Sequence, residues 1–299
     1  MKRRNDTLGY TLILITGTLW GMTGIFTHAI AAMGGSSLTS SFLKTAGAAI
    51  VMTLMFPLLS KSHREHLLIS RRALGRSLLQ GVFTQCLFVI GYLTAIDLLG
   101  MAVAAVLLYT SPFYVTILSK ILFDEKITGT KLAAIALNLL GCFLTVSGGD
   151  LSLTGVSFKG VAAGLFAGLC YSTLPIFSRY STETDDPKAV TYYATLGGLI
   201  SITLLTRPWT HTGMQWDLHA FLLTLVFGLV GTAIPYLLYV KGMQLITEVS
   251  KAPVFASVEN ISAAILGVLL FHESMNLWKA LGILLVFASV VLVNRKTSD

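Results

Sequence analysis

Long stretches without a charged side chain limit what this chain can fold into more than any other feature of its sequence. The stretches free of Asp, Glu, Lys and Arg are 7–43, 77–96, 98–119, 132–149, 160–178, 189–206, 218–240 and 280–294. Each provides all or nearly all of the roughly 20 apolar residues with which a helix crosses a bilayer. The mean hydropathy of +0.77 and the 54% share of hydrophobic residues agree. We therefore predict an all-α polytopic membrane protein without a soluble domain.

The same spacing predicts ten membrane helices. Residues Gly34 to Ser37 interrupt the first stretch, and the helix that follows carries Lys44. A further apolar segment, which carries Glu259, lies between Lys251 and Glu273. The expected helices lie near residues 8–30, 38–59, 77–96, 101–120, 131–148, 158–179, 188–206, 218–240, 251–271 and 277–294.

The basic residues fall mainly on one side of these helices. With the N-terminus in the cytoplasm, 17 of the 21 Lys and Arg residues lie in cytoplasmic segments, Lys44 lies within a helix, and Lys159, Arg207 and Lys279 lie outside. By the positive-inside rule, both termini of this multi-pass protein are cytoplasmic, and we expect it in the inner membrane of a bacterium. The net charge of +7 then reflects orientation and does not indicate nucleic-acid binding. The alternative for the first helix, a signal peptide cleaved near residues 29–31, is disfavoured because the apolar stretch is too long.

The two halves of the chain resemble each other. The matches, at offsets of 147 to 151, include Gly17 with Gly168, Trp20 with Tyr171, Tyr92 with Tyr239, Glu125 with Glu273, and Lys131 with Lys279. Because each half holds five helices, an odd number, the second half enters the membrane from the opposite side. We predict two inverted five-helix repeats, residues 1–150 and 151–299, with a binding site where they meet.

Three segments resemble the EamA-type members of the drug/metabolite transporter superfamily. They are Leu19-Trp20-Gly21-Met22, then Ser111-Pro112-Phe113 followed by residues 123–128, and Val258-Glu259-Asn260 followed by residues 271–273. The resemblance extends over nearly the whole chain. It implies ten helices, a central cavity lined mainly by the first, third, fourth, sixth, eighth and ninth helices, and transport by alternating access. Asp124 and His272 stand where the family usually has Gly, and Asn260 where it has Pro, so no single member's substrate is transferred.

Lys44 and Glu259 are charged residues deep within expected helices. A charge at the centre of a membrane helix costs about 2.5–3.5 kcal/mol on insertion-derived scales, so each side chain should face the protein interior, a cavity or a partner. Glu259 then binds substrate or a coupling proton, or it holds the architecture together. Lys44 can instead extend to the outer interface, because it lies in the first third of its helix. His28, near the outer end of the first helix, either relays a proton or is simply solvated.

Aromatic and polar side chains recur on the helices that match between the halves. Gln85 and Tyr92 share one helix face, and Thr232 and Tyr239 share another. Tyr109 precedes a proline that breaks its helix and leaves carbonyl groups unpaired. Such faces either pack or line a wet cavity in which their polar groups find partners. The candidate substrate-binding residues are Trp20, Gln85, Tyr92, Tyr109, Ser111, Tyr171, Thr232, Tyr236, Tyr239, Glu259 and Asn260.

These features predict a secondary active transporter that exports a small polar metabolite, an amino acid or related amine. The alternative is proton-coupled uptake of a quaternary amine such as choline through an aromatic cage of Trp20, Tyr92, Tyr171 and Tyr239. A membrane sensor or enzyme is disfavoured, because the chain has neither catalytic pairs nor a soluble readout domain.

The sequence gives no sign of bound cofactors or metals. Walker-type loops, His-rich spacings and nucleophile elbows are absent from it, so we expect neither catalysis nor a metal or other cofactor. Cys86, Cys142 and Cys170 lie in apolar runs and should fill the core. The expected partners are a small-molecule substrate and the lipid bilayer, with the protein a monomer or homodimer.

Overall fold

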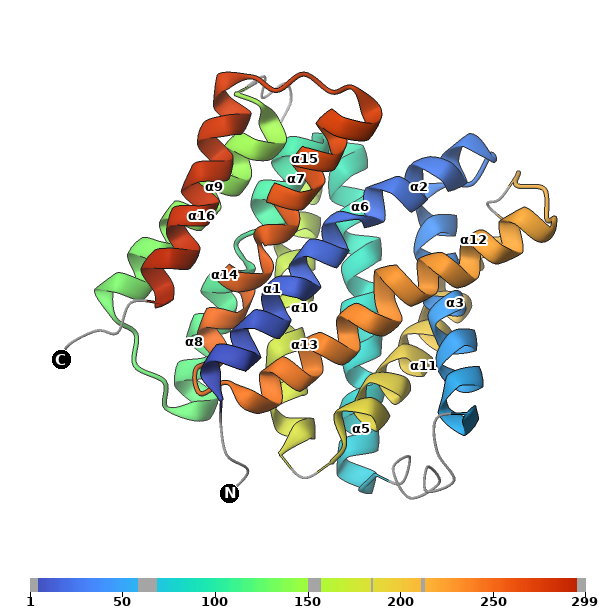
Figure 1. Ribbon diagram of the computed structural model, residues 1–299, viewed down its shortest axis with the longest axis horizontal. Helices are drawn as coiled ribbons and strands as arrows, with labels where there is room; N and C mark the ends of the chain where they lie inside the picture. The colour runs from blue at the N-terminus through green and yellow to red at the C-terminus, as the bar shows by residue number, and fades with distance from the viewer. Residues whose placement is uncertain (1–4, 59–68, 150–156, 184, 211–212, 295–299) are drawn as a thin grey trace.

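The computed structural model describes residues 5–58, 69–149, 157–183, 185–210 and 213–294, and helices dominate this part of the chain (Figure 1). Within it, ten helical segments are long and apolar enough to cross a membrane. The predicted all-α, ten-helix membrane fold is confirmed. The predicted boundary between the two repeats, at residues 150 and 151, lies in the segment 150–156, outside the described residues.

The ten spans are built from the following helices. They are α1 (Asp6–Gly21) with α2 (Thr23–Ala32); α3 (Ser37–Leu58); α5 (Arg71–Gly81), η1 (Val82–Leu87) and α6 (Phe88–Leu99); α7 (Met101–Leu108) with α8 (Ser111–Phe123); α9 (Gly129–Ser147); α10 (Phe158–Thr182); α11 (Pro187–Thr206); α12 (Leu218–Gly228), η3 (Leu229–Ala233) and α13 (Ile234–Leu245); η4 (Val249–Lys251), α14 (Ala252–Ala256) and α15 (Val258–Phe271); and α16 (Leu277–Asn294). A short 3-10 turn, η2 (Pro208–Thr210), follows α11.

The helices extend further than the sequence predicts at several ends. The third span begins at Arg71 and not near residue 77, because Ser70 caps its first turn by accepting a hydrogen bond from the backbone of Ala73. The eighth span continues past Lys241 to Leu245. A charged side chain marks where the hydrocarbon ends, but a helix can continue into the interface, so charge spacing underestimates helix length.

Local backbone features recur in the two halves at the offsets found in the sequence. The third and eighth spans each contain a π-helical segment, beginning at Val82 and at Leu229. The fourth and ninth spans each end in a left-handed residue, Asp124 and His272, with the same φ of 54° and ψ of 30°. These correspondences agree with the predicted repeats. Both positions would suit a glycine, since glycine adopts positive φ without strain.

Two glycines let the first helix of each half approach the other half closely. Gly17 of α1 packs against the backbone of Ala256 at the end of α14, and Gly168 of α10 packs against the carbonyl of Leu107 near the end of α7. A side chain at either position would collide with backbone, which cannot move aside as a side-chain end can. The interruption of the ninth span therefore packs against α1, and the interruption of the fourth span packs against α10.

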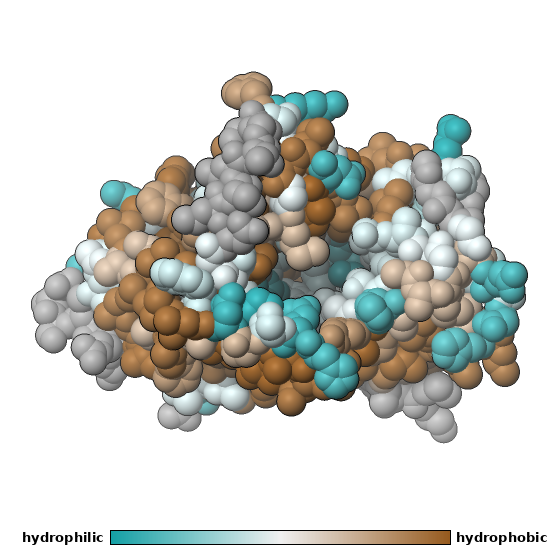
Figure 2. Space-filling view, turned by 90° about the horizontal axis from the view of Figure 1, so that it is seen from above, coloured by the Kyte–Doolittle hydropathy of each residue, from teal (hydrophilic) through white to brown (hydrophobic). Residues whose placement is uncertain are grey.

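The ends of the spans form two opposite faces of the molecule. The lower face is the end where α1 begins and α16 ends, and the upper face is the end where α15 ends and α16 begins (Figure 1). Figure 2 views the upper face and shows it hollowed at the centre, with hydrophilic colour inside the hollow and hydrophobic colour around the outside. Exposed apolar side chains such as Leu54, Leu204 and Phe287 belong to the outer surface that meets lipid.

Candidate functional site

The fourth and ninth spans are both interrupted, and their interruptions meet. Tyr109 ends α7, and Ser257 separates α14 from α15. The phenolic hydroxyl of Tyr109 donates to Oε1 of Glu259 at 3.2 Å and also approaches Oδ1 of Asn260 within hydrogen-bond distance. One hydroxyl proton serves both acceptors, so Tyr109 joins the two halves through a shared hydrogen bond. Helices broken inside a membrane are tolerated where they line a cavity or are buried in protein.

Glu259 lies at the electrostatic centre of this region. It occupies the first turn of α15, where the positive end of the helix dipole stabilises a carboxylate. Its charge interacts with the phenol groups of Tyr92 and Tyr171 and with the ammonium group of Lys44. Glu259 is only half-buried although it lies in the middle of its span. Its side chain therefore keeps some accessible surface within the span.

An aromatic cluster lies beside Glu259. The Trp20 ring contacts Tyr171, Tyr236 and Tyr239 at centroid distances of 6.4, 5.5 and 5.6 Å. Tyr236 and Tyr239 are almost fully buried, whereas Tyr171 keeps accessible surface. Tyr171 is therefore the member of this group with the most accessible surface, and Trp20 packs with the two tyrosines of α13 in the core.

Tyr92 joins the aromatic cluster indirectly. Phe88 lies 5.8 Å from Tyr92 and 5.3 Å from Tyr171, measured between ring centroids. The four residues of the expected cage thus belong to one continuous aromatic wall. Within it, Tyr239 is 2% exposed and Tyr92 is half-buried, so the matched pair is not equivalent in exposure.

A polar network that the sequence analysis did not single out supports the break in the ninth span. Asn138 of α9 donates to the hydroxyl groups of Ser257 and Ser289, and Asn260 donates to the sulfur of Cys142. Asn138 and Ser289 are completely buried. The sequence contains one signal for this network, an asparagine inside an apolar span, because a buried amide in a membrane needs hydrogen-bond partners. Cys142 does fill the core, as do Cys86 and Cys170, but it also accepts this hydrogen bond.

Gln85 and Thr232 occupy matching positions in the two π-helical segments. Gln85 is 5% exposed and Thr232 is 1% exposed, and neither side chain has a hydrogen-bond partner within the described part of the chain. Gln85 packs on Gly198 of α11. Ser111, at the start of α8, is also buried. The polar atoms of Gln85 and Thr232 are thus buried without a hydrogen-bond partner among the described residues, and the structure does not bring Gln85 into contact with Glu259.

Lys44 and His28 lie in different surroundings. The side chain of Lys44 is half-buried and runs along Gly231 of η3, so it turns into the bundle. His28 of α2 is exposed, and its ring lies 4.6 Å from that of Phe271. His28 is therefore near the upper face, distant in the fold from the meeting point of the broken spans. Among the described residues no group of three His, Cys, Asp or Glu residues is arranged to hold a metal ion.

A charged network closes the lower face. Glu248, just before η4, pairs with Lys131 and Lys251, with shortest N–O distances of 2.5 and 2.7 Å. Burial raises the pKa of Glu248, but the hydrogen bonds and charges of the two lysines together outweigh it, so its pKa lies below the ordinary value. Tyr10 of α1 donates to the backbone carbonyl of Glu248. The network ties the start of the ninth span to α9 and α1.

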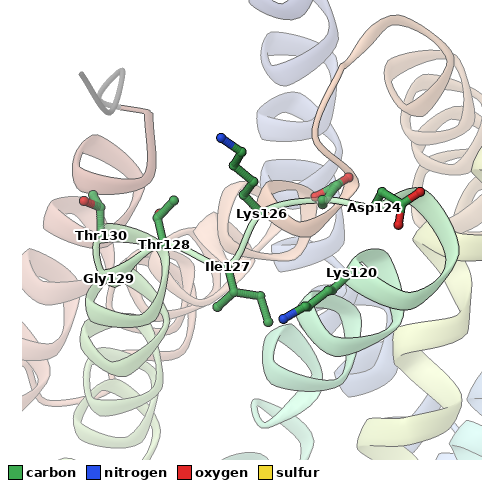
Figure 3. A pocket seen from close by; sticks show the side chains of 8 residues that line it. Lys120, Asp124, Lys126, Ile127, Thr128, Gly129 and Thr130 are labelled. Carbon is green, nitrogen blue, oxygen red and sulfur yellow. The ribbon is translucent and has the colours of Figure 1, made fainter. Parts of the chain in front are cut away.

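The connection from α8 to α9 crosses the same face and lines a pocket of about 670 Å³. Figure 3 shows Lys120 and Asp124 at the end of α8 and Thr128 to Thr130 at the start of α9. Lys120 and Lys126 are exposed, so this pocket is a solvated surface feature, separate from the aromatic wall.

A comparison with known protein families matches this chain in two parts. A model described as "EamA-like transporter family" matches residues 7–147 and again residues 158–295. The chain belongs to this family. The two matches correspond to the two halves in which the helix interruptions recur, and EamA proteins form part of the drug/metabolite transporter superfamily.

Relatives of this EamA protein match it over nearly its whole length. It is 30% identical over 293 residues to a Salmonella typhimurium protein named "Uncharacterized inner membrane transporter YicL", covering 96% of this chain and 95% of that protein. It is 28% identical over 291 residues to an Archaeoglobus fulgidus protein named "Uncharacterized transporter", covering 96% and 97%. A solved crystal structure with a TM-score of 0.74 and 17% identity covers 95% of this chain and 96% of its own, and shares the fold. The protein is a multi-pass membrane transporter.

Proposed function

We propose that this EamA protein is a secondary active transporter that exports a small polar metabolite, an amino acid or related amine, by alternating access. One observation carries the proposal. Glu259, on a helix N-terminus at mid-span, is hydrogen-bonded by Tyr109 of the other half and lies beside an aromatic wall. A site at the junction of two repeats can bind from either side of the membrane as the halves move relative to each other.

The chemistry of the site favours an ammonium group. The carboxylate of Glu259 accepts hydrogen bonds, and the aromatic wall attracts cations through its ring faces. Lys44 supplies an opposite charge within electrostatic range of Glu259, so a ligand with both an ammonium and a carboxylate group can be recognised at its two ends. An amino acid has this pair of groups, and the polar atoms of Gln85 and Thr232 offer further partners deeper in the bundle.

A second candidate, uptake of a quaternary amine such as choline, is favoured by the contacts of Trp20 with three tyrosines. A desolvated cation over an aromatic face gains about 2 kcal/mol. Trp20→Phe weakens such an interaction, so choline binding should fall by up to about 30-fold, while the affinity for a zwitterionic amino acid should change less. Trp278→Phe is the matched control, because Trp278 is half-exposed at the start of α16, a helix that contributes no residue to the aromatic wall.

Ligand-induced stabilisation provides the first test of the proposal. Purified protein is melted in the presence of the protein amino acids, choline and nucleosides, since a ligand that binds the native state raises the melting temperature. Compounds that stabilise the protein are then offered, radiolabelled, to proteoliposomes preloaded with the same unlabelled compound. We expect exchange of at least one amino acid or amine. If nucleosides alone stabilise the protein and exchange, the proposed substrate class is wrong.

The proposal includes an orientation. We place the lower face in the cytoplasm, since it carries Lys120, Lys126 and Lys241, which agrees with the positive-inside rule. The hollow of the upper face then opens to the outside (Figure 2).

A further inference from the structure

Glu125 fastens the start of the ninth span at the lower face. One of its carboxylate oxygens accepts the backbone N–H of Val249, and the other accepts the N–H and the hydroxyl of Ser250. The side chain of Glu125 is only 9% exposed. Since the first N–H groups of a helix lack partners within it, a carboxylate in this place both caps the helix and fixes it to the end of α8. We call these contacts of Glu125 the lower latch.

Lys131 strengthens the lower latch. Its ammonium group lies 3.6 Å from Glu125, contacts Glu248, and donates to the backbone carbonyl of Lys126 at 3.0 Å. Lys131 is 6% exposed. A buried lysine with three oxygen partners holds the α8–α9 connection against the segment that leads into the ninth span.

Glu273 is the counterpart of Glu125 in the second half, at the upper face. Each residue follows a left-handed residue, and each backbone N–H bonds to the carbonyl six residues earlier, Glu125 to Ser119 and Glu273 to Gly267. Glu273 also pairs with Lys279, the counterpart of Lys131, at 2.9 Å. The backbone and the lysine partner of the lower latch are thus repeated at the opposite face.

The carboxylate of Glu273 is nevertheless unlatched. Its side chain is 51% exposed and folds back over Gly267 of its own helix. In the lower latch the donors are the N–H groups of Val249 and Ser250, and the matching residues of the first half, 148 positions earlier, are Met101 and Ala102. These residues open α7, whose N-cap is Gly100 and which has no side-chain cap in the described structure. Both the carboxylate and the N–H groups that would complete an upper latch are therefore present at the upper face but apart.

We propose that Glu273 and the first turn of α7 form an upper latch that closes the hollow of the upper face when the lower latch opens. The inference rests on the proposed function, because it supplies the contact that stabilises the opposite end state of alternating access. In that state, the carboxylate of Glu273 accepts the N–H groups of Met101 and Ala102, and Glu125 releases those of Val249 and Ser250. Since the two states exchange one capped helix start for another, their free energies stay close, as rapid alternation requires.

Distances across both faces test the proposal without any substrate. Spin labels are placed at Leu98 and Leu277 for the upper face and at Lys120 and Lys241 for the lower face, all of which have exposed side chains. Cys86, Cys142 and Cys170 are first replaced by alanine. Pulsed electron paramagnetic resonance on protein in lipid nanodiscs then gives the distribution of label-to-label distances across each face. It is recorded for the parent, Glu125→Gln, Glu273→Gln and the double variant. Glu183→Gln, at an exposed carboxylate after α10, is the control.

The two latches predict opposite shifts. Glu125→Gln should increase the population with a short upper and a long lower distance by about tenfold relative to the parent, the effect of weakening a charge-assisted hydrogen bond. Adding Glu273→Gln should reverse this shift, and Glu183→Gln should leave both distances unchanged. If Glu125→Gln cannot be purified, Ser250→Ala, which removes one donor to Glu125, takes its place. The proposal is overturned if the double variant matches Glu125→Gln, or if Glu273→Gln shifts the distances in the same direction as Glu125→Gln.

The outcome is separable from that of the transport assay. If the parent protein exchanges an amino acid but the latch variants leave the distances unchanged, the proposed function stands and the latch is refuted. If the parent protein exchanges no compound of the panel but the latch variants shift the distances in opposite directions, the proposed substrate class is refuted and the latch is supported.

Discussion

The phenolic oxygen of Tyr109 lies 3.2 Å from a carboxylate oxygen of Glu259, and 150 residues separate the two along the chain. The contact joins the end of α7 to the start of α15, so it connects the broken span of one half to that of the other. Binding of substrate at Glu259, or a change in its protonation, therefore directly affects both halves. Tyr109 should consequently contribute to transport even where it does not itself touch the substrate.

Tyr109→Phe should impair transport while leaving the fold intact. It removes the hydroxyl that donates to Glu259 and Asn260 but keeps the ring, and a hydrogen bond to a charged group is worth about 1.5–3 kcal/mol. We expect a loss of about tenfold or more in exchange rate in proteoliposomes. Tyr114→Phe, on α8 of the same span, is the control and should exchange like the parent. Equal exchange rates for both variants would show that the Tyr109 hydroxyl has no role.

The sequence predicts much of this fold because a membrane imposes simple rules. Charge-free stretches identify the ten spans, and the odd number of helices in each half predicts how the halves are related. The interruptions at Tyr109 and Ser257 are less visible, since a nearby proline shows where a helix can break but not whether two breaks face each other. Contact between Tyr109 and Asn260 depends on helix packing between the halves, which no local pattern encodes.

The candidate site shows the same division. Trp20 and Tyr171 come together as their matched positions suggest, because related helices cross at the centre of related halves. The burial of Tyr239 behind Trp20 does not follow from its matched position beside Tyr92. Asn138 was missed because it stands alone in an apolar span, and a single buried amide has no spacing pattern.

Gly17→Ala should destabilise the protein. Its new methyl group would collide with the backbone carbonyl of Ala256, and overpacking of a tight contact costs about 1–3 kcal/mol. Gly24→Ala, in α2 of the same span, meets no neighbouring atom of the described residues within 4 Å. It should be neutral or stabilising, since alanine is favoured over glycine in a helix by about 1 kcal/mol. Thermal melting in detergent measures both. A lower melting temperature for Gly24→Ala than for Gly17→Ala would contradict the helix packing described.

Acidification should weaken the lower face through Glu248. Because the pKa of Glu248 is lower in the folded protein than its ordinary value of 4.5, the carboxylate contributes stability above that value and loses it as the pH falls through the lowered pKa. Glu248 is about one-third exposed, so we expect a contribution of less than about 1 kcal/mol. Melting temperatures between pH 6 and pH 3.5 should therefore fall less steeply for Glu248→Gln than for the parent. Parallel curves would exclude this role.

Cysteine labelling in intact cells tests the orientation. Single cysteines at Ser37 and Lys159, exposed positions on the face that we place outside, should react with a membrane-impermeant maleimide. Cysteines at Lys126 and Glu183, exposed on the opposite face, should react only after the cells are opened. The reverse pattern would place the termini outside the cell.

Exchange and pH-driven accumulation by Glu259→Gln test the central claim, that Glu259 binds the substrate or its coupling proton. The substitution keeps the size and hydrogen bonding of the side chain but removes its charge. Proteoliposomes holding the parent or Glu259→Gln are compared for exchange of the compound identified by thermal shift and for accumulation driven by a pH gradient. If Glu259 binds the ammonium group, both activities should fall by at least about tenfold, and if it carries the proton, accumulation should be lost while exchange persists. Parent-like rates in both assays, with an unchanged pH dependence, would contradict the account and make Glu259 an architectural residue.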